Sequence, residues 1–438
     1  MIKKKLFLGL ALFSVMLESC KKDDEEPKPT TGYVQGTVTD ADNATAIEGV
    51  RVIILNSDTN EPVTSLITNA EGNYNAELEQ GSYYTRLYAQ GYQQVPPKGV
   101  SPLPFTISVS QTLEKPIEMN PISTIGNGWI TGKVTSNGTE VSSALVVASV
   151  NDEAYSTITD NEGIYHLYNV PANTYSLNAW IAGLQGNGTS AIVPSNLEAQ
   201  FDLNLDSQAS GEVFGAITFL STNAVNVDVS LTHPLTGEAI PGLITETSAN
   251  YSISNVPNGT YIARATYQND GRVVDPDWIV KNGEPVVSVN NNSVELKFSL
   301  TDALIVVSPT NEASTTEPFI VGNAVPTFEW EPYPSASDYV IEVSDASGNV
   351  IWGGFDNSGN FPVKKVFLNK DNPNMITDAT SGNKSVVFNF DNTATEALQP
   401  GKIYRWKVYV SKDDAKEATG WKLVSASEDQ RGIIQIPE

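Results

Sequence analysis

One sequence pattern occurs three times along this chain, and it constrains the fold more than any other feature. Each copy opens with a strand-like segment that contains a glycine, at Gly36, Gly132 and Gly215. These glycines are separated by 96 and 83 residues. That spacing exceeds the roughly 20 to 50 residues of solenoid repeats and is the size of a complete small domain. We therefore expect each copy to fold as a module that buries its own hydrophobic core.

Within each copy, apolar residues alternate with other residues, as they do at Val50, Val52 and Ile54. Alternation with a period of two is typical of strands with one buried face. Turn residues separate these runs, and apolar residues do not recur at helical spacing over three turns, so any helix is expected to be short. The predicted fold class is all-β, with tandem antiparallel β-sandwiches.

The turns between the strands also repeat. TNAEGNY (68–74) and TDNEGIY (159–165) place a glycine where a hairpin turn needs a positive φ, with a tyrosine just inside the next strand. In the third copy we read Asn250 as the replacement for this glycine, because asparagine tolerates a positive φ better than most residues. The next turn is expected to follow the same design, with Pro171 and Pro257 presetting φ.

The order of these segments resembles the carboxypeptidase regulatory-like domain. In the first copy the resemblance is carried by YVQGTVTD (33–40), GVRVIIL (49–55), TNAEGNY (68–74) and QGSYYTRLYAQGY (80–92). The resemblance implies a transthyretin-like sandwich of the carbohydrate-binding-like fold, and a fold of this kind does not by itself dictate function. The three transthyretin-like modules are expected at residues 33–120, 127–207 and 211–302.

From residue 304 the pattern changes, and residues 304–438 resemble a fibronectin type III-like domain. Trp330 is expected in its core. The tyrosine-corner sequence of that family is matched by Leu398, Pro400, Gly401 and Tyr404. In such corners the tyrosine hydroxyl hydrogen-bonds to the preceding loop. Residues 369–384 lie in a connection longer than the fold needs, and we expect them to form an exposed insertion.

Residues 1–19 resemble a bacterial lipoprotein signal peptide. Three lysines precede an apolar run that ends at Leu17 and is shorter than the ~20 residues that span a bilayer. Cys20, the only cysteine, follows directly after a lipobox-like sequence. The resemblance implies that Cys20 is acylated, and several acyl chains on one residue would anchor the chain firmly. An ordinary cleavage site is the alternative.

Residues 20–32 are charged and contain prolines, and we expect an acidic, solvated tether. Acidic runs behind a lipidated cysteine resemble signals that send lipoproteins to the outer face of some Gram-negative bacteria. We therefore expect an outer-membrane, lipid-anchored protein that faces the cell exterior, with a periplasmic orientation as the alternative. A net charge of −25 argues against nucleic acid as a partner.

The sequence offers little that could perform catalysis. His166 and His233 are its two histidines, and they fall in different modules without metal-ligand spacing. Glycine-rich nucleotide motifs and nucleophile motifs do not occur in a strand-to-helix context. We therefore predict a protein that is not an enzyme and that has no cofactor. A site built on loops of two modules is the enzymatic alternative.

Two further chemistries stay open as alternatives. Asp40, Asp42 and Asn43 lie in one loop and offer oxygen ligands to Ca²⁺, but the EF-hand glycine and final glutamate are missing. A turn-forming role for these residues is favoured. Lys133, in an opening strand, is a candidate for an isopeptide bond of the kind found in pilin and adhesin relatives of the sandwich, although it has no recognisable partner motif. We predict no metal site.

Sugar binding would use an exposed aromatic face with polar side chains beside it. Trp278 is the best candidate, because the segment DPDWIV places its indole beside Asp275 and Asp277. Trp129 and Trp180 are weaker candidates. For all three tryptophans, packing in a core or between modules is the favoured alternative.

These features predict a non-catalytic protein of the outer surface that binds carbohydrate or a partner protein through its sandwich modules. Carbohydrate is suggested by the family resemblance alone. The alternative is a structural stalk, or an accessory subunit of an outer-membrane receptor or adhesion complex.

Overall fold

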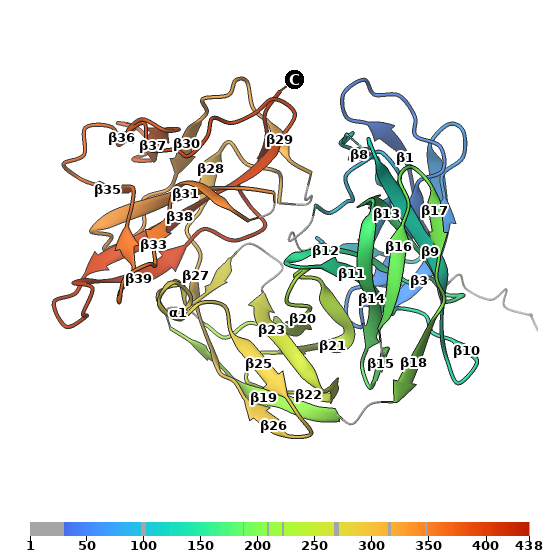
Figure 1. Cartoon of the computed structure of the whole chain (residues 1–438). Helices are drawn as coiled ribbons and strands as arrows, with labels where there is room; N and C mark the ends of the chain where they lie inside the picture. Colours follow the sequence, from blue (N-terminus) through green and yellow to red (C-terminus); the bar gives the residue numbers. More distant parts are fainter. Residues whose placement is uncertain are drawn as a thin grey trace, which may run out of the picture.

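The computed structural model describes residues 30–437, apart from residues 98–101, 124, 187, 208–209, 221–222, 267–270, 314–316 and 347. The predicted signal peptide, Cys20 and most of the predicted tether lie outside the described residues. The described part is built almost entirely of β-strands, with one short helix, and its sheets form a series of sandwiches (Figure 1). The predicted all-β fold class is confirmed. No helix among the described residues is long and apolar enough to cross a bilayer.

The first repeat is a sandwich of two sheets. One sheet has the order β4-β1-β7, with β8 also pairing β1, and the other has the order β3-β2-β5-β6. The strands are β1 (Thr31–Asp40), β2 (Arg51–Asn56), β3 (Pro62–Ile67), β4 (Asn73–Glu79), β5 (Gly81–Tyr88), β6 (Phe105–Ile107), β7 (Thr112–Glu114) and β8 (Ile117–Met119).

In the second repeat the two layers are joined at one side, through the pairing of β15 with β18. The order is β10-β9-β18-β15-β14-β11-β12, with β13 and β17 pairing β9 and β16 pairing β14. The strands are β9 (Asn127–Ser136), β10 (Thr139–Glu140), β11 (Leu145–Val150), β12 (Glu153–Ile158), β13 (Ile164–Pro171), β14 (Asn173–Ile181), β15 (Leu184–Gly186), β16 (Thr189–Val193), β17 (Glu198–Gln200) and β18 (Leu203–Ser207).

The third repeat again has two sheets, and it contains the helix. The sheet orders are β22-β19-β27-β24, with β26 on β19, and β21-β20-β23-β25. The elements are β19 (Ser210–Phe219), β20 (Val227–Thr232), β21 (Ala239–Thr247), β22 (Asn250–Pro257), β23 (Gly259–Thr266), β24 (Arg272–Val274), α1 (Pro276–Asn282), β25 (Val286–Val289), β26 (Ser293–Glu295) and β27 (Phe298–Asp302).

The C-terminal sandwich pairs a small sheet, β28-β30-β37-β36, with a larger one, β29-β40-β38-β31-β32, to which β35 and β39 are added. A two-stranded ribbon, β33-β34, stands beside them. The strands are β28 (Val306–Ser308), β29 (Phe319–Ile320), β30 (Thr327–Trp330), β31 (Asp338–Asp345), β32 (Val350–Gly353), β33 (Phe355–Asp356), β34 (Val363–Lys364), β35 (Phe367–Asn369), β36 (Ile376–Thr377), β37 (Lys384–Val387), β38 (Ile403–Asp413), β39 (Trp421–Ala426) and β40 (Ile433–Gln435).

Most strand pairs are antiparallel, but the opening strand of each repeat also has parallel neighbours. β1 pairs β7 and β8 in parallel, β9 pairs β17 and β18, and β19 pairs β26 and β27. Parallel neighbours require a long crossover connection. The chain therefore reaches the parallel side of the opening strand at the end of each repeat, after it has formed the other sheet.

The opening glycine of each repeat permits a close approach of this returning chain. A Cβ on Gly36 would lie 2.1 Å from the carbonyl oxygen of Lys115, which any larger residue would prevent. The hydroxyl of Tyr74 donates a hydrogen bond to the same carbonyl at 2.6 Å. The same arrangement recurs as Gly132, Phe201 and Tyr165 in the second repeat and as Gly215, Leu296 and Tyr251 in the third. In each repeat, the glycine thus makes room for the returning carbonyl and the tyrosine hydroxyl hydrogen-bonds to it.

The turn glycines of the first two repeats have the expected conformation, with φ of 72° at Gly72 and 74° at Gly163. The prediction for Asn250 was wrong, because neither Asn250 nor Ala249, which precedes it as Gly72 precedes Asn73, has a positive φ. The Thr247 hydroxyl accepts a hydrogen bond from the Ala249 backbone instead, so a different turn joins these strands.

In the next turn of the second and third repeats, the positive φ falls on Asn169 (59°) and Asn255 (55°). Both residues lie where the strand register shifts at a bulge or irregularity. A bulge inserts an extra residue that the partner strand cannot match, and asparagine tolerates the left-handed conformation found there. The expected prolines follow two residues later, at the ends of β13 and β22.

The expectation that each repeat buries its own core holds for the first two repeats, but the core of the third is shared. Separate clusters do fill the first repeat, the second repeat and the C-terminal sandwich. The core of the third repeat, however, is continuous with side chains from the other two. Four come from the first repeat and four from the second: Ile53, Leu55, Tyr84, Tyr88, Leu145, Val147, Ala154 and Ile158. We call this shared cluster, with the ion pairs around it, the repeat junction.

The repeat junction forms because β2 and β11 are buried on both faces. Val52 and Ile54 face the core of the first repeat, whereas Ile53 and Leu55 face the junction. Two buried ion pairs cross between repeats, Arg51 with Asp160 and Arg86 with Glu238, the second at 2.6 Å. The modules are therefore packed against one another rather than linked only by short polar segments (Figure 1).

Candidate functional site

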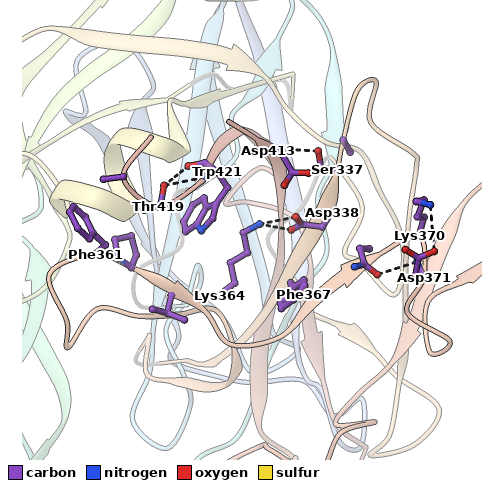
Figure 2. Close-up of a pocket in the computed structure, with 15 residues that line it drawn as sticks. Ser337, Asp338, Phe361, Lys364, Phe367, Lys370, Asp371, Asp413, Thr419 and Trp421 are labelled. Atoms are coloured by element: carbon purple, nitrogen blue, oxygen red, sulfur yellow. Dashed lines mark hydrogen bonds and ion pairs between the residues drawn. The ribbon is translucent and has the colours of Figure 1, made fainter. Parts of the chain in front are cut away.

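The described residues enclose a pocket of about 820 Å³ on the C-terminal sandwich. It lies where β31, β34 and β35 meet the ends of β38 and β39. Its lining residues are Ala336, Ser337, Asp338, Phe361, Pro362, Val363, Lys364, Phe367, Asn369, Lys370, Asp371, Asp413, Ala418, Thr419 and Trp421. Figure 2 shows Phe361 at one end and Lys370 with Asp371 at the other, so the site is elongated.

A buried ion pair forms the middle of the pocket. The Nζ atom of Lys364 lies 2.8 and 2.7 Å from the two carboxylate oxygens of Asp338, and it also donates to the Ser411 hydroxyl at 2.6 Å. The side chains of Lys364 and Asp338 are 9% and 8% exposed. Because each buried charge is neutralised by the other, this part of the pocket wall carries no net charge.

Trp421 forms the aromatic part of the pocket wall beside this ion pair. Lys364 Nζ lies 4.9 Å from the centre of its ring, which is a cation–π distance. The indole also stacks with Phe355, with 5.7 Å between ring centres and 26° between ring planes. Contacts of this kind hold the indole in place, so the pocket has a preformed aromatic surface.

The rim of the pocket exposes three apolar side chains. Phe361 is 53% exposed, Val363 is 61% exposed and Phe367 is 47% exposed. Together with Trp421 they make an apolar surface around polar groups. Exposed apolar surface concentrated at a concave site is a feature of ligand and partner binding.

Polar groups at the pocket are oriented by backbone hydrogen bonds. Ser337 Oγ accepts from the backbone N–H of Asp413 at 3.0 Å, and Asn369 Oδ1 accepts from that of Asp371 at 3.1 Å. Asp413 and Asp371 both line the pocket, and the carboxylate of Asp371 pairs with Lys370 at 3.5 Å. The Asn369 amide N–H₂ group adds hydrogen-bond donors.

The lining of the pocket combines aromatic and polar groups. Its lining residues include no histidine and no cysteine. Of its two lysines, Lys364 is engaged by Asp338 and Ser411, and Lys370 pairs with Asp371 at 3.5 Å. Within the described ranges, no group of three or more His, Cys, Asp or Glu side chains could hold a metal ion. An aromatic wall with oriented hydrogen-bonding groups is a composition typical of small-molecule sites.

The structure places Trp278, Asp275 and Asp277 on or beside α1, outside this pocket. Asp275 is the N-cap and accepts a hydrogen bond from the Asp277 backbone at 3.1 Å. Burial raises the pKa of the Asp275 carboxyl. Asp277 Oδ1 accepts from the backbone N–H of Leu423 at 2.8 Å, so this carboxylate joins the third repeat to the C-terminal sandwich. Trp278 is 40% exposed.

Trp180 packs between modules, as its favoured alternative predicted. Its ring centre lies 4.7 Å from that of His233 in the third repeat, and the indole packs against the repeat junction. His233 is 9% exposed, and burial lowers its pKa to about 4. The other histidine, His166, stacks on Tyr168, and burial together with the nearby Arg51 lowers its pKa. Both histidines are therefore packing residues at module boundaries.

The loop proposed as a calcium site is organised by its own hydrogen bonds. Asp40 Oδ1 accepts from the Asp42 backbone at 2.9 Å, and Oδ2 accepts from the Tyr92 hydroxyl at 3.0 Å. Asn43 Oδ1 accepts from the Thr45 backbone at 2.9 Å. These contacts favour the turn-forming role of the loop.

Lys133, the isopeptide candidate, forms an exposed ion pair with Glu140 at 2.8 Å. Its side chain is 40% exposed. The pair raises the pKa of Lys133 and lowers that of Glu140, as expected for opposite charges in contact. An exposed lysine that is paired with a carboxylate fits an ordinary surface salt bridge.

The pocket was not predicted from the sequence, although two signals pointed to it. The connection from Trp352 to Leu398 was longer than a sandwich needs, and it contains phenylalanines at 355, 361 and 367 among polar residues. We expected residues 369–384 to be an exposed insertion. The pocket uses the start of that connection, whose strands β34 and β35 lie beside β31 and β38.

Comparison with known families identifies one module. Residues 33–114 match the carboxypeptidase regulatory-like domain. This match confirms the resemblance of the first repeat to that family, and it covers most of the regulatory-like module expected at residues 33–120. None of the curated proteins matches this chain.

Several solved structures are similar to this chain, at low sequence identity. The major pilin subunit BcpA of Bacillus cereus is 12% identical, with 62% of this chain and 100% of the pilin covered and a TM-score of 0.19. The shaft pilin SpaA of Lactobacillus rhamnosus GG is 11% identical, with 41% and 97% covered and a TM-score of 0.19. A leucine-rich repeat protein of Bacteroides thetaiotaomicron is 17% identical, with 40% and 26% covered and a TM-score of 0.22. TM-scores of this size carry no argument about function.

Proposed function

We propose that this protein is a non-catalytic binding protein whose C-terminal pocket holds a neutral oligosaccharide. The observation that carries the proposal is the pocket of about 820 Å³ with Trp421 in its wall and Phe361 and Phe367 at its rim. Aromatic rings stack on the apolar faces of sugar rings, and oriented polar groups then bind the sugar hydroxyls.

The polar groups of the pocket favour an uncharged sugar over an acidic one. Asp371 and Asp413 present carboxylates, which accept hydrogen bonds from hydroxyl groups and repel anions. Lys364 is neutralised by Asp338 and Lys370 pairs with Asp371 at 3.5 Å, so the carboxylate of Asp413 is the remaining charge among the lining residues. The net charge of −25 adds to the unfavourable potential for an acidic glycan.

The proposal is tested by binding of the mature chain to an array of neutral and acidic glycans. Cellohexaose and mannohexaose serve as neutral probes in titration calorimetry, and a polygalacturonate hexamer serves as the acidic probe. We expect a neutral probe to bind and the double variant Phe361→Ala/Phe367→Ala to lose at least about tenfold in affinity, because each stacked ring contributes about 1 kcal/mol.

The matched control is Phe319→Ala. Phe319 is 48% exposed on β29 of the same sandwich and does not line the pocket. This variant should retain the affinity of the natural chain. Equal affinity for the double variant and the natural chain, or a preference for the acidic probe, would remove the pocket from consideration as a site for neutral glycans.

We also propose that the chain is a lipoprotein of the outer membrane, anchored through Cys20 and facing the cell exterior. The support is the sequence of residues 1–32, which combines a signal-like segment, a single cysteine and an acidic run. Cys20→Ala should release the protein from membranes into the soluble fraction. Membrane association that persists in this variant would contradict the lipid anchor, and loss of signal after protease treatment of intact cells tests the outward orientation.

The C-terminal sandwich is proposed to be fibronectin type III-like. Trp330 is completely buried in its core, and the Tyr404 hydroxyl accepts a hydrogen bond from the backbone N–H of Gln399 at 2.9 Å. Both features match the expectations for that family, and the second is the predicted tyrosine-corner contact.

A structural or accessory role is the second candidate function, and the repeat junction favours it. Modules that share one apolar cluster and two buried ion pairs hold a fixed arrangement. Such a body could support a partner protein of an outer-surface complex. Binding of no glycan by the natural chain, together with recovery of one defined partner after crosslinking on cells, would favour this role over sugar binding.

A further inference from the structure

The pocket is built against the third repeat, although all of its lining residues belong to the C-terminal sandwich. The helix α1 of the third repeat packs on β39, and Val280 and Trp421 both pack against a small apolar cluster that includes Leu423. Trp421 is therefore both a wall of the pocket and part of this contact. We call the contact between α1 and β39 the α1 joint.

Three polar contacts fix the α1 joint. Asp277 Oδ1 accepts from the backbone N–H of Leu423 at 2.8 Å. Lys281 Nζ donates to Asp277 Oδ2 at 2.7 Å and to Glu417 Oε2 at 3.0 Å. Lys281 thus connects the helix to the loop that precedes Trp421. Its side chain is 19% exposed, so water screens these contacts only in part.

Glu417 belongs to the loop that forms one wall of the pocket. Its neighbours Ala418 and Thr419 line the pocket, and the loop is closed by a hydrogen bond from the Asp414 backbone to the Gly420 carbonyl at 3.0 Å. The Thr419 hydroxyl donates to the Trp421 carbonyl. The contact of Lys281 with Glu417 therefore restrains the same loop that leads into Trp421.

Trp421 also makes a cation–π contact with one lysine from each of the two modules that form the joint. Lys281 Nζ lies 5.7 Å from the centre of the indole ring, and Lys364 Nζ lies 4.9 Å from it. Cation–π contacts of partly buried lysines restrict how the ring can tilt. Lys281 comes from the third repeat and Lys364 from the pocket itself, so the orientation of the indole depends on both modules.

We propose that Lys281 is a positioning residue for the pocket, and that the α1 joint regulates ligand affinity by fixing Trp421 and residues 414–420. The inference rests on the proposed function for its ligand. A ligand that stacks on the indole binds more tightly when the indole is already held, because less conformational freedom is lost on binding. By linkage, the bound ligand must stabilise the joint by the same factor.

The test compares three variants of the full mature chain. Lys281→Met keeps the length of the side chain and removes its charge, Lys281→Arg keeps the charge, and Lys297→Met removes an exposed lysine of the same repeat. Lys297 is 66% exposed and pairs with Glu295 outside the joint. The two readouts are affinity for cellohexaose and mannohexaose, and hydrogen exchange of the amides in residues 414–423.

We expect Lys281→Met to weaken binding of the neutral probe by about fivefold or more, which is a typical coupling between two sites. Amide exchange in residues 414–423 should become faster in the same variant. Lys281→Arg should restore both readouts toward the natural chain, and Lys297→Met should change neither. A merely structural role would lower the overall stability of Lys281→Met without accelerating exchange selectively in this segment.

Unchanged affinity and unchanged exchange in Lys281→Met would overturn the inference. So would an equal change in Lys297→Met. If the natural chain binds neither neutral probe, the proposed function fails. The hydrogen-exchange measurement then tests the positioning role by itself. If residues 414–423 exchange no faster in Lys281→Met than in the natural chain, α1 does not hold this wall of the pocket.

Discussion

At the repeat junction, side chains of three modules form one apolar cluster, whereas at the α1 joint a short helix meets one edge of a sandwich. The junction includes at least eight completely or nearly buried residues from the first two repeats and two buried ion pairs. The joint has a small cluster around Leu423, with Asp277 and Lys281 supplying its polar contacts. The first contact fixes the modules as one body, and the second leaves the pocket wall dependent on a few side chains.

The difference shows that modules with similar sequences need not be independent units. In β2 every residue from Arg51 to Leu55 is buried, and in β11 the first four residues are buried. A strand that is buried on both faces must be covered by a second layer outside its own sandwich. In the full chain, the neighbouring repeats supply that layer.

The largest effect is expected when one partner of a buried ion pair at the junction is removed. Arg86→Met leaves Glu238, which is 8% exposed, as a buried charge without its cation. We expect the free energy of unfolding to fall by about 3–5 kcal/mol in urea denaturation.

The double variant Arg86→Met/Glu238→Leu should recover part of this loss, because no buried charge remains. Arg264→Met serves as the control, because its pair with Glu284 is 30% and 46% exposed. We expect that control to change stability by less than about 1 kcal/mol. A similar small effect for Arg86→Met would show that the junction is not closed in solution.

A somewhat smaller effect is expected for Leu55→Ala. Leu55 is completely buried, but its neighbours belong to the repeat junction and not to the core of its own module. Truncation should lower the free energy of unfolding by about 3 kcal/mol, a usual cost for a buried leucine. Ile192→Ala, at a site that is 67% exposed on β16, is the control. If the modules were independent, Leu55 would lie on an outer surface and both variants would behave alike.

The pH dependence of stability tests the same junction through His233. Burial lowers its pKa from 6.5 to about 4. Between these values the unfolded chain binds a proton that the folded chain does not, so stability falls as the pH is lowered from 6.5 toward 4 and the loss is complete below 4. The full difference is about 3 kcal/mol, at about 1.4 kcal/mol for each pH unit.

His233→Asn should flatten this part of the stability profile, because asparagine does not titrate and can still accept a hydrogen bond in the turn. The comparison uses slopes between pH 6.5 and 4, so a constant loss of packing in the variant does not affect it. Carboxylates titrate near the lower end of this range in both proteins, so their contribution cancels in the difference between the two slopes. Equal slopes would mean that His233 is accessible to water and that the boundary between the second and third repeats is open.

Much of the local structure could be predicted from the sequence. The repeat spacing predicted tandem sandwiches, and alternation predicted that they are built of strands. Trp330 and Tyr404 were placed correctly because a core tryptophan and a tyrosine corner are defined by nearby residues. The family match of residues 33–114 agrees with the motifs that identified the first copy.

The repeat junction was missed because alternation was read from every second residue of β2. Val50, Val52 and Ile54 satisfy the pattern, but Ile53 and Leu55 between them are also apolar. A continuous apolar run predicts burial on both faces. The run therefore contained the signal for the junction, although it could not identify the partner modules.

The pocket could not be predicted in the same way, because it unites residues that are far apart in the sequence. Ser337, Lys364 and Trp421 become neighbours only through the pairing of β31 with β35 and β38 and of β38 with β39. Strand order and register in a sandwich are set by tertiary packing, which a single sequence does not specify. The exposed phenylalanines in a polar connection were the available local signal.

The smallest effect is expected for Trp278→Ala, and it distinguishes the pocket from the site suggested by the sequence. Trp278 is 40% exposed on α1, and its neighbour Asp277 is engaged by Leu423 and Lys281. We expect stability to change by less than about 1 kcal/mol, as is usual for a partly exposed residue, and affinity for neutral glycans to stay within twofold in calorimetry. A loss of binding comparable to that of Phe361→Ala/Phe367→Ala would instead place the sugar on the outer face of α1. The helix α1 would then form a binding surface. The α1 joint would in that case be more polar than the repeat junction because it binds ligand, and not because it positions the pocket wall.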